Sequence, residues 1–164
     1  ALKQYPVLSV GVFVNMPVEN AIKIMRDCQL DLAQLHGDET PEDLIAFEGK
    51  AFKAFRGIPE DAILQKYLAH GSGISPSFLL DASVTGVYGG SGEIADWQEA
   101  GRLSEGHPFL LAGGLKPANV ASAIQVVRPW GVDTASGVEI RPGVKDIKKV
   151  KEFIEAVKSA EQTY

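Results

Sequence analysis

One aspartate stands at the end of an apolar stretch in the middle of the chain, where a carboxyl group could transfer a proton. Asp81 closes Ser77-Phe-Leu-Leu-Asp81, a run that is typical of a buried strand. The carboxyl ends of the strands form the catalytic face of a parallel barrel. A carboxyl group there, beneath a glycine-rich loop, would be partly removed from water, which favours the protonated form that a general acid uses. Asp81 is therefore a candidate general acid, and the alternative is an aspartate that only caps the following loop.

Two stretches rich in small residues could bind a phosphate group through their backbone. They are Leu110-Leu-Ala-Gly-Gly-Leu115 and Gly131-Val-Asp-Thr-Ala-Ser-Gly-Val-Glu139. Small residues at a strand end let the backbone approach a ligand, and a following helix offers N–H donors at its N-terminus. We expect the backbone N–H groups of Gly113, Gly114, Ser136 and Gly137 to form a phosphate-binding cradle. The alternative is that these residues only form turns.

Four further polar residues lie at or beside predicted strand ends, where they could contact a substrate. Gln34 and His36 end one strand, although a single histidine there is equally consistent with a structural hydrogen bond. Arg56 follows another strand and could bind a carboxylate, or could lie on the surface without a ligand. Asp133 alternates with the buried residues of the last strand and could bind substrate or only neighbouring backbone groups.

The elements that would position these residues alternate regularly along the chain. Apolar runs predict strands over residues 7–14, 30–35, 51–55, 77–81, 108–112 and 132–135. Apolar periodicity, capping residues and prolines predict helices that begin near residues 17, 40, 60, 97, 117 and 146. Thr40 to Asp43 is expected to form a variant of the capping box, and Asp146 is expected to cap the last helix. Six strand–helix alternations indicate an α/β chain with a parallel sheet, organised as a single domain over residues 1–164.

Four details of the sequence make specific structural predictions. The nearly continuous apolar run of residues 7–14 predicts a strand that is covered on both faces. Residues 82–95 predict a long glycine-rich loop of the kind that often serves as a lid, and Asp96 is expected to cap a helix beginning at Trp97. Cys28 is expected to be a buried structural thiol at the end of a helix.

Composition narrows the classes of partner and compartment. The formal net charge is −5, and no basic patch with interleaved aromatic residues indicates nucleic-acid binding. No apolar run approaches membrane-spanning length, and no signal-peptide pattern is present, so we expect a cytoplasmic protein without a membrane partner. A single cysteine excludes an internal disulfide and fits a reducing compartment. The spacing of His36, His70 and His107 does not match a metal site, so no metal is expected.

The motifs, taken in order, resemble the phosphoribosylanthranilate isomerase family of tryptophan biosynthesis. The matching stretches are Val10-Gly-Val-Phe-Val14, Gln34-Leu-His-Gly37, Leu79-Leu-Asp81 with Gly89-Gly-Ser-Gly92 and Asp96-Trp97, Leu111-Ala-Gly-Gly-Leu115 with Pro117 and Asn119, and Asp133 with Ala135-Ser-Gly-Val-Glu139. The resemblance implies a TIM-type (β/α) barrel of eight units. This chain matches six of them, the family's strands three to eight. Neither the family's first strand, with its general-base cysteine, nor the arginine loop of its second unit is matched.

The resemblance also implies an activity. The family converts N-(5-phosphoribosyl)anthranilate, a phosphorylated sugar–anthranilate, into 1-(2-carboxyphenylamino)-1-deoxyribulose 5-phosphate by an Amadori rearrangement that needs no cofactor. Asp81 aligns with the family's general acid. The glycine turns align with its phosphate site, and Gln34 and His36 align with positions that line the site. Because the cysteine strand is not matched, we expect the isolated chain to be poorly active and the N-terminal barrel segment to be a possible partner.

Two other functions are compatible with the sequence. The chain could be an incomplete barrel fragment or split-barrel module that binds phosphate without catalysis. It could also be another phosphate-binding barrel enzyme, such as an epimerase or a lyase, because such enzymes share the glycine turns. They do not share the stretch Gln34 to Gly37 together with the Asp81 strand.

Overall fold

The computed structural model describes residues 5–71, 76–82 and 92–161 of the chain. By its contacts the chain divides into two compact units. The first comprises Ala1–Phe55 and Pro59–Leu79, and the second comprises Arg56–Ile58 and Leu80–Tyr164. The organisation of residues 1–164 as a single domain stays a prediction, and the two units are described in turn.

Three parallel strands form the sheet of the first unit. They are β1 (Val10–Phe13), β2 (Leu32–Leu35) and β3 (Ala51–Arg56), and they are neighbours in this order. The helices that follow them are α1 (Val18–Cys28), α2 (Pro41–Ile45) and α3 (Asp61–Leu68). In the register, Phe13 is paired with Leu35 and Leu35 with Lys53, so these three side chains point to the same face of the sheet.

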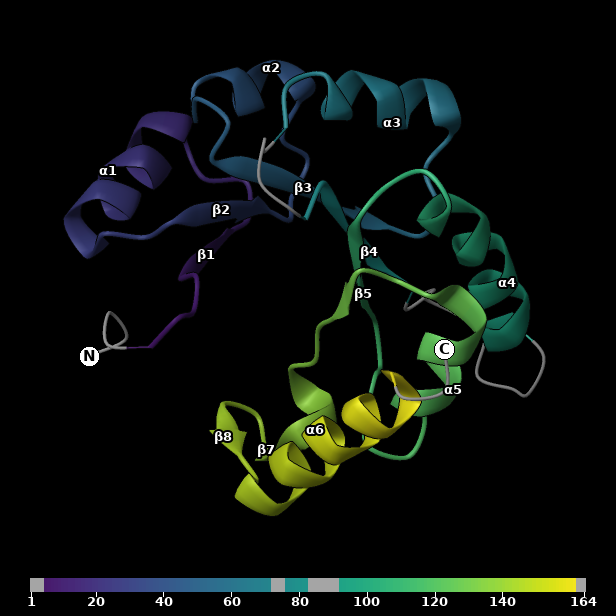
Figure 1. The fold of residues 1–164 in the computed structure, drawn as a ribbon. Coiled ribbons are helices and arrows are strands. Elements are labelled where there is room, and N and C mark those ends of the chain that lie inside the picture. Colours follow the sequence, from purple (N-terminus) through teal and green to yellow (C-terminus); the bar gives the residue numbers. More distant parts are fainter. Residues whose placement is uncertain (1–4, 72–75, 83–91, 162–164) are drawn as a thin grey trace. The chain divides into compact units, whose positions relative to one another are not determined.

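That face packs against α1 and α2, which Figure 1 shows in purple and blue beside the strands. The core there joins Phe13, Ala33, Leu35 and Ala51 of the strands to Ala21 and Met25 of α1 and Leu44 and Phe47 near α2. Ala21 and Met25 lie four residues apart and so share one side of the helix, as the apolar period predicts. The predicted capping box at the start of α2 is confirmed, because Thr40 and Asp43 exchange hydrogen bonds.

The second unit contains the end of β4 (Phe78–Asp81), followed by β5 (Phe109–Ala112) and β6 (Gly131–Val132). β5 and β6 are parallel, with Leu110 paired with Gly131. The helices are α4 (Gly92–Ser104), α5 (Val120–Val127) and α6 (Ile147–Glu161). α5 contacts both α4 and α6, and four of its eight residues are buried. Asp146 caps α6 as predicted, because its Oδ1 accepts hydrogen bonds from the backbone N–H groups of Lys148 and Lys149.

The expected sequence of six strands and six helices is confirmed, but several boundaries differ. β6 is two residues long, and a 3₁₀ turn over Ser136–Val138 follows it. A small antiparallel hairpin of β7 (Glu139–Arg141) and β8 (Val144–Lys145) was not predicted. α4 begins at Gly92, so Asp96 lies inside the helix and does not cap it. The rest of the predicted lid, residues 83–91, lies outside the described residues.

Two predictions about burial are wrong. Val10 and Val12 are 42% and 59% exposed, so β1 is covered on one face only. The reason is that α1 and α2 pack on the face that carries Phe13, and β1 is the terminal strand of the described sheet. Cys28 is exposed rather than buried, because the last buried residue of α1 is Met25, one turn earlier. No helix within the described ranges is long and apolar enough to cross a membrane.

Candidate active site

Asp81 lies at the carboxyl end of β4, beside the ends of two neighbouring segments. The backbone N–H of Ala82 donates a 3.0 Å hydrogen bond to the carbonyl of Ala112, the last residue of β5. The N–H of Gly57 donates a 2.9 Å bond to the carbonyl of Asp81 itself. Arg56 directly precedes Gly57 and is exposed, whereas Asp81 is half-buried. The second unit thus brings the candidate acid close to the turn that follows β5 and to the residue after Arg56.

The two stretches proposed to bind phosphate pack directly on each other. Thr134 Oγ1 donates a 2.7 Å hydrogen bond to the carbonyl of Leu115. A Cβ atom at Gly137 would lie only 1.9 Å from the same carbonyl oxygen, so no other residue fits at this position without a shift of the backbone. Gly113 and Gly114 have φ angles of 96° and 64°, in the left-handed region that favours glycine. The predicted proximity of the two turns is present; their role in binding phosphate stays a prediction.

An asparagine fixes the first of these turns. Asn119 Oδ1 accepts a 2.8 Å hydrogen bond from the N–H of Lys116, and Asn119 Nδ2 donates a 3.2 Å bond to the carbonyl of Gly114. One side chain therefore binds backbone groups at two points of the loop between β5 and α5. This contact holds the carbonyl of Gly114, at which an added Cβ atom would meet nothing within 4 Å.

Two lysines hold the second turn from the side of the hairpin. Lys145 Nζ donates to the carbonyl of Ala135 at 2.7 Å and to Glu139 Oε1 at 2.9 Å. Lys149 Nζ donates to the carbonyl of Glu139 at 2.7 Å. The hydrogen bond from Lys145 holds the pKa of Glu139 below its ordinary value of 4.5, despite the opposing effect of desolvation. The sequence signal for this hairpin was the Pro142-Gly143 pair, which commonly forms a tight turn.

Asp133 sits between these turns and β5. Its backbone N–H donates a 2.8 Å hydrogen bond to the carbonyl of Leu111, and its side chain is exposed. Asp133 therefore extends the alignment with β5 by one hydrogen bond beyond β6. Whether its carboxyl group contacts substrate stays a prediction.

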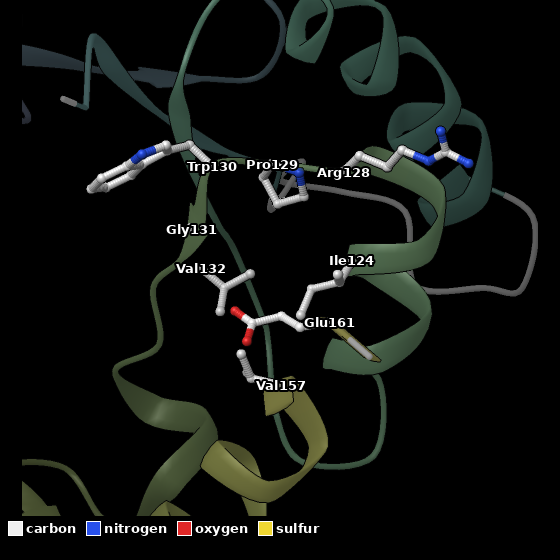
Figure 2. Close-up of a pocket in the computed structure, with 8 residues that line it drawn as sticks. All are labelled: Ile124, Arg128, Pro129, Trp130, Gly131, Val132, Val157 and Glu161. Carbon is white, nitrogen blue, oxygen red and sulfur yellow. The ribbon is translucent and has the colours of Figure 1, made fainter. Parts of the chain in front are cut away.

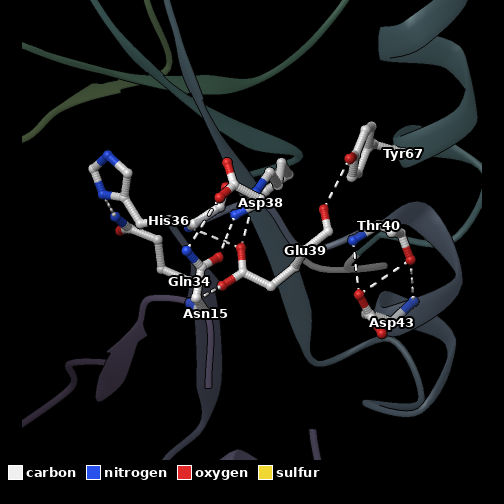
Figure 3. A network of polar contacts seen from close by, with 10 residues as sticks. Asn15, Gln34, His36, Asp38, Glu39, Thr40, Asp43 and Tyr67 are labelled. Carbon is white, nitrogen blue, oxygen red and sulfur yellow. Dashed lines mark hydrogen bonds and ion pairs between the residues drawn. The ribbon is translucent and has the colours of Figure 1, made fainter. Parts of the chain in front are cut away.

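Gln34 and His36 lie together at the end of β2, in the first unit (Figure 3). Gln34 is 8% exposed, and its Nε2 lies 3.1 Å from His36 Nδ1. The backbone N–H of His36 donates a 2.8 Å bond to the carbonyl of Phe13. Because side chains alternate along a strand, Gln34 and His36 point away from the face that packs on α1 and α2. The two candidates are thus brought together on the face of the sheet opposite α1 and α2.

A buried ion pair between Glu39 and Lys53 lies beside the turn that follows β2, and the sequence analysis did not predict it. Lys53 Nζ is 2.9 Å from Glu39 Oε2, and the side chains of both residues are 6% exposed. Burial raises the pKa of Glu39, but hydrogen bonds from Lys53 and from backbone N–H groups outweigh it and hold the pKa below 4.5. The available sequence signal was a lone lysine in the otherwise apolar run Ala51-Phe-Lys-Ala-Phe55, since lysine is rarely buried without a partner.

A separate pocket of about 350 Å³ lies where β6 begins, between the C-terminal parts of α5 and α6 (Figure 2). Ile124, Arg128, Pro129, Trp130, Gly131, Val132, Val157 and Glu161 line it. None of the candidate site residues is among them, so this pocket is not the proposed phosphate cradle. Within the described part of the chain, no cluster of three or more His, Cys, Asp or Glu side chains is arranged for a metal ion.

Comparisons with known proteins give a consistent family. The family model described as "N-(5'phosphoribosyl)anthranilate (PRA) isomerase" matches residues 1–156. N-(5'-phosphoribosyl)anthranilate isomerase of Myxococcus xanthus is 44% identical over 151 residues, covering 91% of this chain and 70% of the relative. The enzyme of the same name from Trichlorobacter lovleyi is 44% identical over 157 residues, covering 94% of this chain and 74% of the relative.

Solved structures agree with this. The crystal structure of phosphoribosyl anthranilate isomerase from Thermotoga maritima has a TM-score of 0.74 and 36% identity, covering 96% of this chain and 77% of its own. A phosphoribosyl anthranilate isomerase in complex with reduced 1-(o-carboxyphenylamino)-1-deoxyribulose 5-phosphate has a TM-score of 0.71 and 32% identity, covering 94% and 74%. The related sequences and the solved structures therefore agree with the sequence motifs and with the parallel α/β fold. The chain belongs to the N-(5'-phosphoribosyl)anthranilate isomerase family.

Proposed function

We propose that this chain catalyses the isomerisation of N-(5-phosphoribosyl)anthranilate to 1-(2-carboxyphenylamino)-1-deoxyribulose 5-phosphate, a step of tryptophan biosynthesis. The observation that carries the proposal is Asp81 at the end of β4, joined through the Ala82–Ala112 hydrogen bond to the strand that leads into Gly113 and Gly114. This arrangement supports an acid beside an anion-binding turn. Family membership supplies the substrate class.

In the proposed reaction, Asp81 donates its proton to the furanose ring oxygen of the substrate. The C1–O bond breaks, the nitrogen lone pair forms an iminium ion, and the sugar chain opens. A general base then removes the proton from C2, which gives an enolamine, and tautomerisation of the enolamine yields the ketone. The iminium ion accepts the electron pair released from C2, so the reaction proceeds without a separate electron acceptor.

The substrate's phosphate would bind to the backbone N–H groups of Gly113, Gly114, Ser136 and Gly137. Support comes from the close packing of the two turns at Leu115 and from the contacts that fix them through Asn119 and Lys145. A cradle built from a held backbone binds without reorganisation, which is the requirement for positioning a reacting sugar. Arg56, Asp133, Gln34 and His36 are the proposed contacts to the rest of the substrate.

We further propose that strands corresponding to the family's first two units complete the barrel and supply the general base. A polypeptide of these 164 residues alone would then bind the phosphorylated product more readily than it turns over substrate. Mixing it with a peptide that covers the first two units of the Thermotoga maritima relative tests this, with anthranilate fluorescence as the readout of turnover. Restored turnover is expected. Full activity of the 164 residues by themselves would contradict the proposal.

The role of Asp81 is tested by Asp81→Asn in the same complemented protein. A positioned general acid contributes about 10²- to 10⁴-fold, so kcat should fall by that amount with little change in KM. Asp27→Asn, on the exposed Lys23–Asp27 pair of α1, is the matched control and should leave kcat unchanged. An Asp81→Asn protein that keeps wild-type kcat would eliminate Asp81 as the acid. Phosphate binding without turnover in any mixture would favour a binding module over an enzyme.

A further inference from the structure

The buried Lys53–Glu39 pair has more contacts than an ion pair needs for its own stability. Charged groups that leave water are destabilised unless geometry and additional hydrogen bonds compensate for the lost hydration. Here the compensation comes almost entirely from backbone groups of two turns. These turns follow β1 and β2 at the end of the sheet where Gln34 and His36 lie (Figure 3).

The carboxylate of Glu39 binds one N–H group from each turn. Its Oε1 accepts a 2.7 Å hydrogen bond from the N–H of Asn15, which follows β1. Its Oε2 accepts a 2.8 Å bond from the N–H of Gly37, which follows β2. A single buried side chain therefore cross-links two turns whose residues are 22 positions apart in the sequence, 37 minus 15.

The ammonium group of Lys53 holds the same turn from its other side. Lys53 Nζ donates a 2.5 Å hydrogen bond to the carbonyl of Gly37, in addition to its bond with Glu39. Tyr67 Oη, from α3, donates a 2.8 Å bond to the carbonyl of Glu39. The backbone of Gly37 is thus fixed at both its N–H and its C=O group.

Steric packing provides a second, independent link between the turns. A Cβ atom at Gly37 would lie 2.2 Å from Asn15 Oδ1 and 2.6 Å from the N of Asn15. Asn15 itself has a φ of 51°, and its side chain exchanges hydrogen bonds with Asp38: Nδ2 to Oδ2 at 3.1 Å, and Oδ1 from the N–H at 2.6 Å. The two turns therefore pack so closely that a side chain at Gly37 would not fit between them.

The fixed turn directly continues His36. Leu35 is paired with Lys53 in the register, so Lys53 points to the helix-covered face while Gln34 and His36 point to the opposite one. Holding Gly37 therefore restrains the backbone that carries the His36 ring, which the Gln34 amide contacts at 3.1 Å. The ion pair therefore lies on one side of this short backbone segment, and the candidate substrate contacts Gln34 and His36 lie on the other.

We propose that Glu39 and Lys53 are positioning residues of this active site: their buried ion pair locks the turns after β1 and β2 and thereby presents Gln34 and His36 to the substrate. The substrate part of this inference rests on the proposed isomerase function. The mechanical part, that the pair fixes the orientation of His36, does not. Because the affected contacts are to bound substrate rather than to the acid Asp81, loss of the lock should raise KM more than it lowers kcat.

The test uses two single variants, Lys53→Met and Glu39→Gln, and the double variant Lys53→Met/Glu39→Gln. Each single variant leaves one partner of a buried pair unmatched, whereas the double variant removes both side-chain charges and should regain thermal stability. Lys23→Met, at the exposed Lys23–Asp27 pair, is the control. NMR signals of the His36 ring, assigned with His36→Gln, report orientation. Isothermal titration with reduced 1-(o-carboxyphenylamino)-1-deoxyribulose 5-phosphate reports affinity, and turnover is measured in the complemented protein.

We expect displaced His36 signals and about tenfold or greater loss of affinity, equivalent to about 1.4 kcal/mol, in all three variants. The double variant should remain weak even where its melting temperature recovers, and Lys23→Met should match wild type. If the double variant regains both affinity for the product analogue and thermal stability, the pair has only a structural role and does not position His36. Unchanged His36 signals in folded variants would overturn the proposal outright.

Two further results separate this proposal from the proposed function. If wild type binds no product analogue while the variants displace the His36 signals, the lock stands and the isomerase assignment fails. If no variant folds, hydrogen exchange on wild type decides. The amides of Asn15 and Gly37 should then be protected as strongly as those of β1 and β2, and fast exchange at both would overturn the lock.

Discussion

Gly137 is the residue at which the candidate cradle tolerates least change. Its missing side chain allows the carbonyl of Leu115 to approach, since a Cβ atom would lie 1.9 Å from that oxygen. Gly137→Ala should therefore push the two turns apart and lower affinity for the phosphorylated product analogue at least tenfold, by titration calorimetry. Gly106→Ala is the control, because a methyl group there meets no atom within 4 Å. Equal affinities of the two variants would exclude a tightly packed cradle.

The ionisation of Glu39 gives a pH-dependent prediction. Its pKa in the folded protein is below the ordinary 4.5, so its carboxylate stabilises the fold above the unfolded pKa. This contribution is lost as pH falls through the folded pKa. At pH 7, Glu39→Gln should lower the free energy of unfolding by about 3–5 kcal/mol, because Lys53 is left buried and unmatched. The difference from wild type should shrink steadily below about pH 4.5, as followed by urea unfolding.

Other charged groups near Glu39 do not reverse this sign. Burial raises the pKa of Tyr67, as do the negative charges of Glu39, Glu42 and Asp43, so the tyrosine hydroxyl remains a neutral donor at pH 7. A difference between wild type and Glu39→Gln that stays constant from pH 7 to pH 3 would contradict the assignment of this carboxylate as the charged partner of Lys53.

For individual residues, the sequence predicted contacts between residues close together in the chain but not between residues far apart in it. Thr40 and Asp43 are three residues apart, and their capping box follows from local helix geometry. Glu39 and Lys53 are 14 residues apart, and their contact depends on the pairing of β2 with β3. The position of Asp81 at a strand end was predictable from an apolar run, whereas the side chains that hold the turns depend on loop conformation.

Among the elements, the β7–β8 hairpin has the clearest effect on the candidate site. Lys145 joins this hairpin to the carbonyl of Ala135, next to Ser136. Lys145→Met should weaken binding of inorganic phosphate about three- to tenfold, a modest loss because the lysine side chain is 46% exposed and solvent screens its charge. It should also reduce the dependence of binding on salt between about 50 and 200 mM.

Lys148→Met is the matched control for that experiment. The Lys148 side chain is 85% exposed and pairs at 3.6 Å with Glu152 on the same helix. The substitution therefore removes the same charge as Lys145→Met but removes no side-chain contact to the turn. Equal loss in both variants would show that only net charge matters, and that the hairpin does not position the turn.

The elements differ in how well the sequence predicts them. β2 to β5 are mostly buried and mostly apolar stretches of four to six residues, long enough for their composition to be recognised. β6 has two residues and β8 has two, too few to give a periodic pattern. The predicted start of α4, at Trp97, is five residues too late because Asp96 resembles a capping residue. The helix begins at Gly92.

At the scale of the whole chain, the exposed face of β1 leads to a prediction about association between copies of the chain. Val10 and Val12 of β1 are 42% and 59% exposed, Val14 directly after it is 55% exposed, and β1 is at the end of the described sheet order. Exposed apolar edge strands promote association between chains. The 164-residue polypeptide should therefore associate as its concentration rises, and Val12→Lys should reduce this in sedimentation velocity experiments without lowering the melting temperature.

Val126→Lys provides the comparison, since Val126 is 40% exposed but lies on helix α5. It should leave association unchanged. If both substitutions reduce association equally, the effect follows from net charge and not from the strand edge.

The sequence predicted the fold class of the whole chain from the order of its elements, because six strand–helix alternations allow few arrangements other than a parallel sheet. Physical reasoning could not predict which face of β1 would be covered. An apolar run such as Val10-Gly-Val-Phe-Val14 looks the same in the sequence whether its second face is covered or exposed. The substrate class came from the resemblance to a family, and no residue spacing alone would have supplied it.

The exposed thiol of Cys28 makes the chain easy to label at one defined position. It is the only cysteine in the sequence, and it ends α1, ahead of β2 and so at the other end of that strand from His36. A maleimide dye or spin label would therefore attach at a single point without mutagenesis and without occupying the candidate site. Ligand binding could then be followed by fluorescence or by spin-label spectroscopy on otherwise unaltered protein.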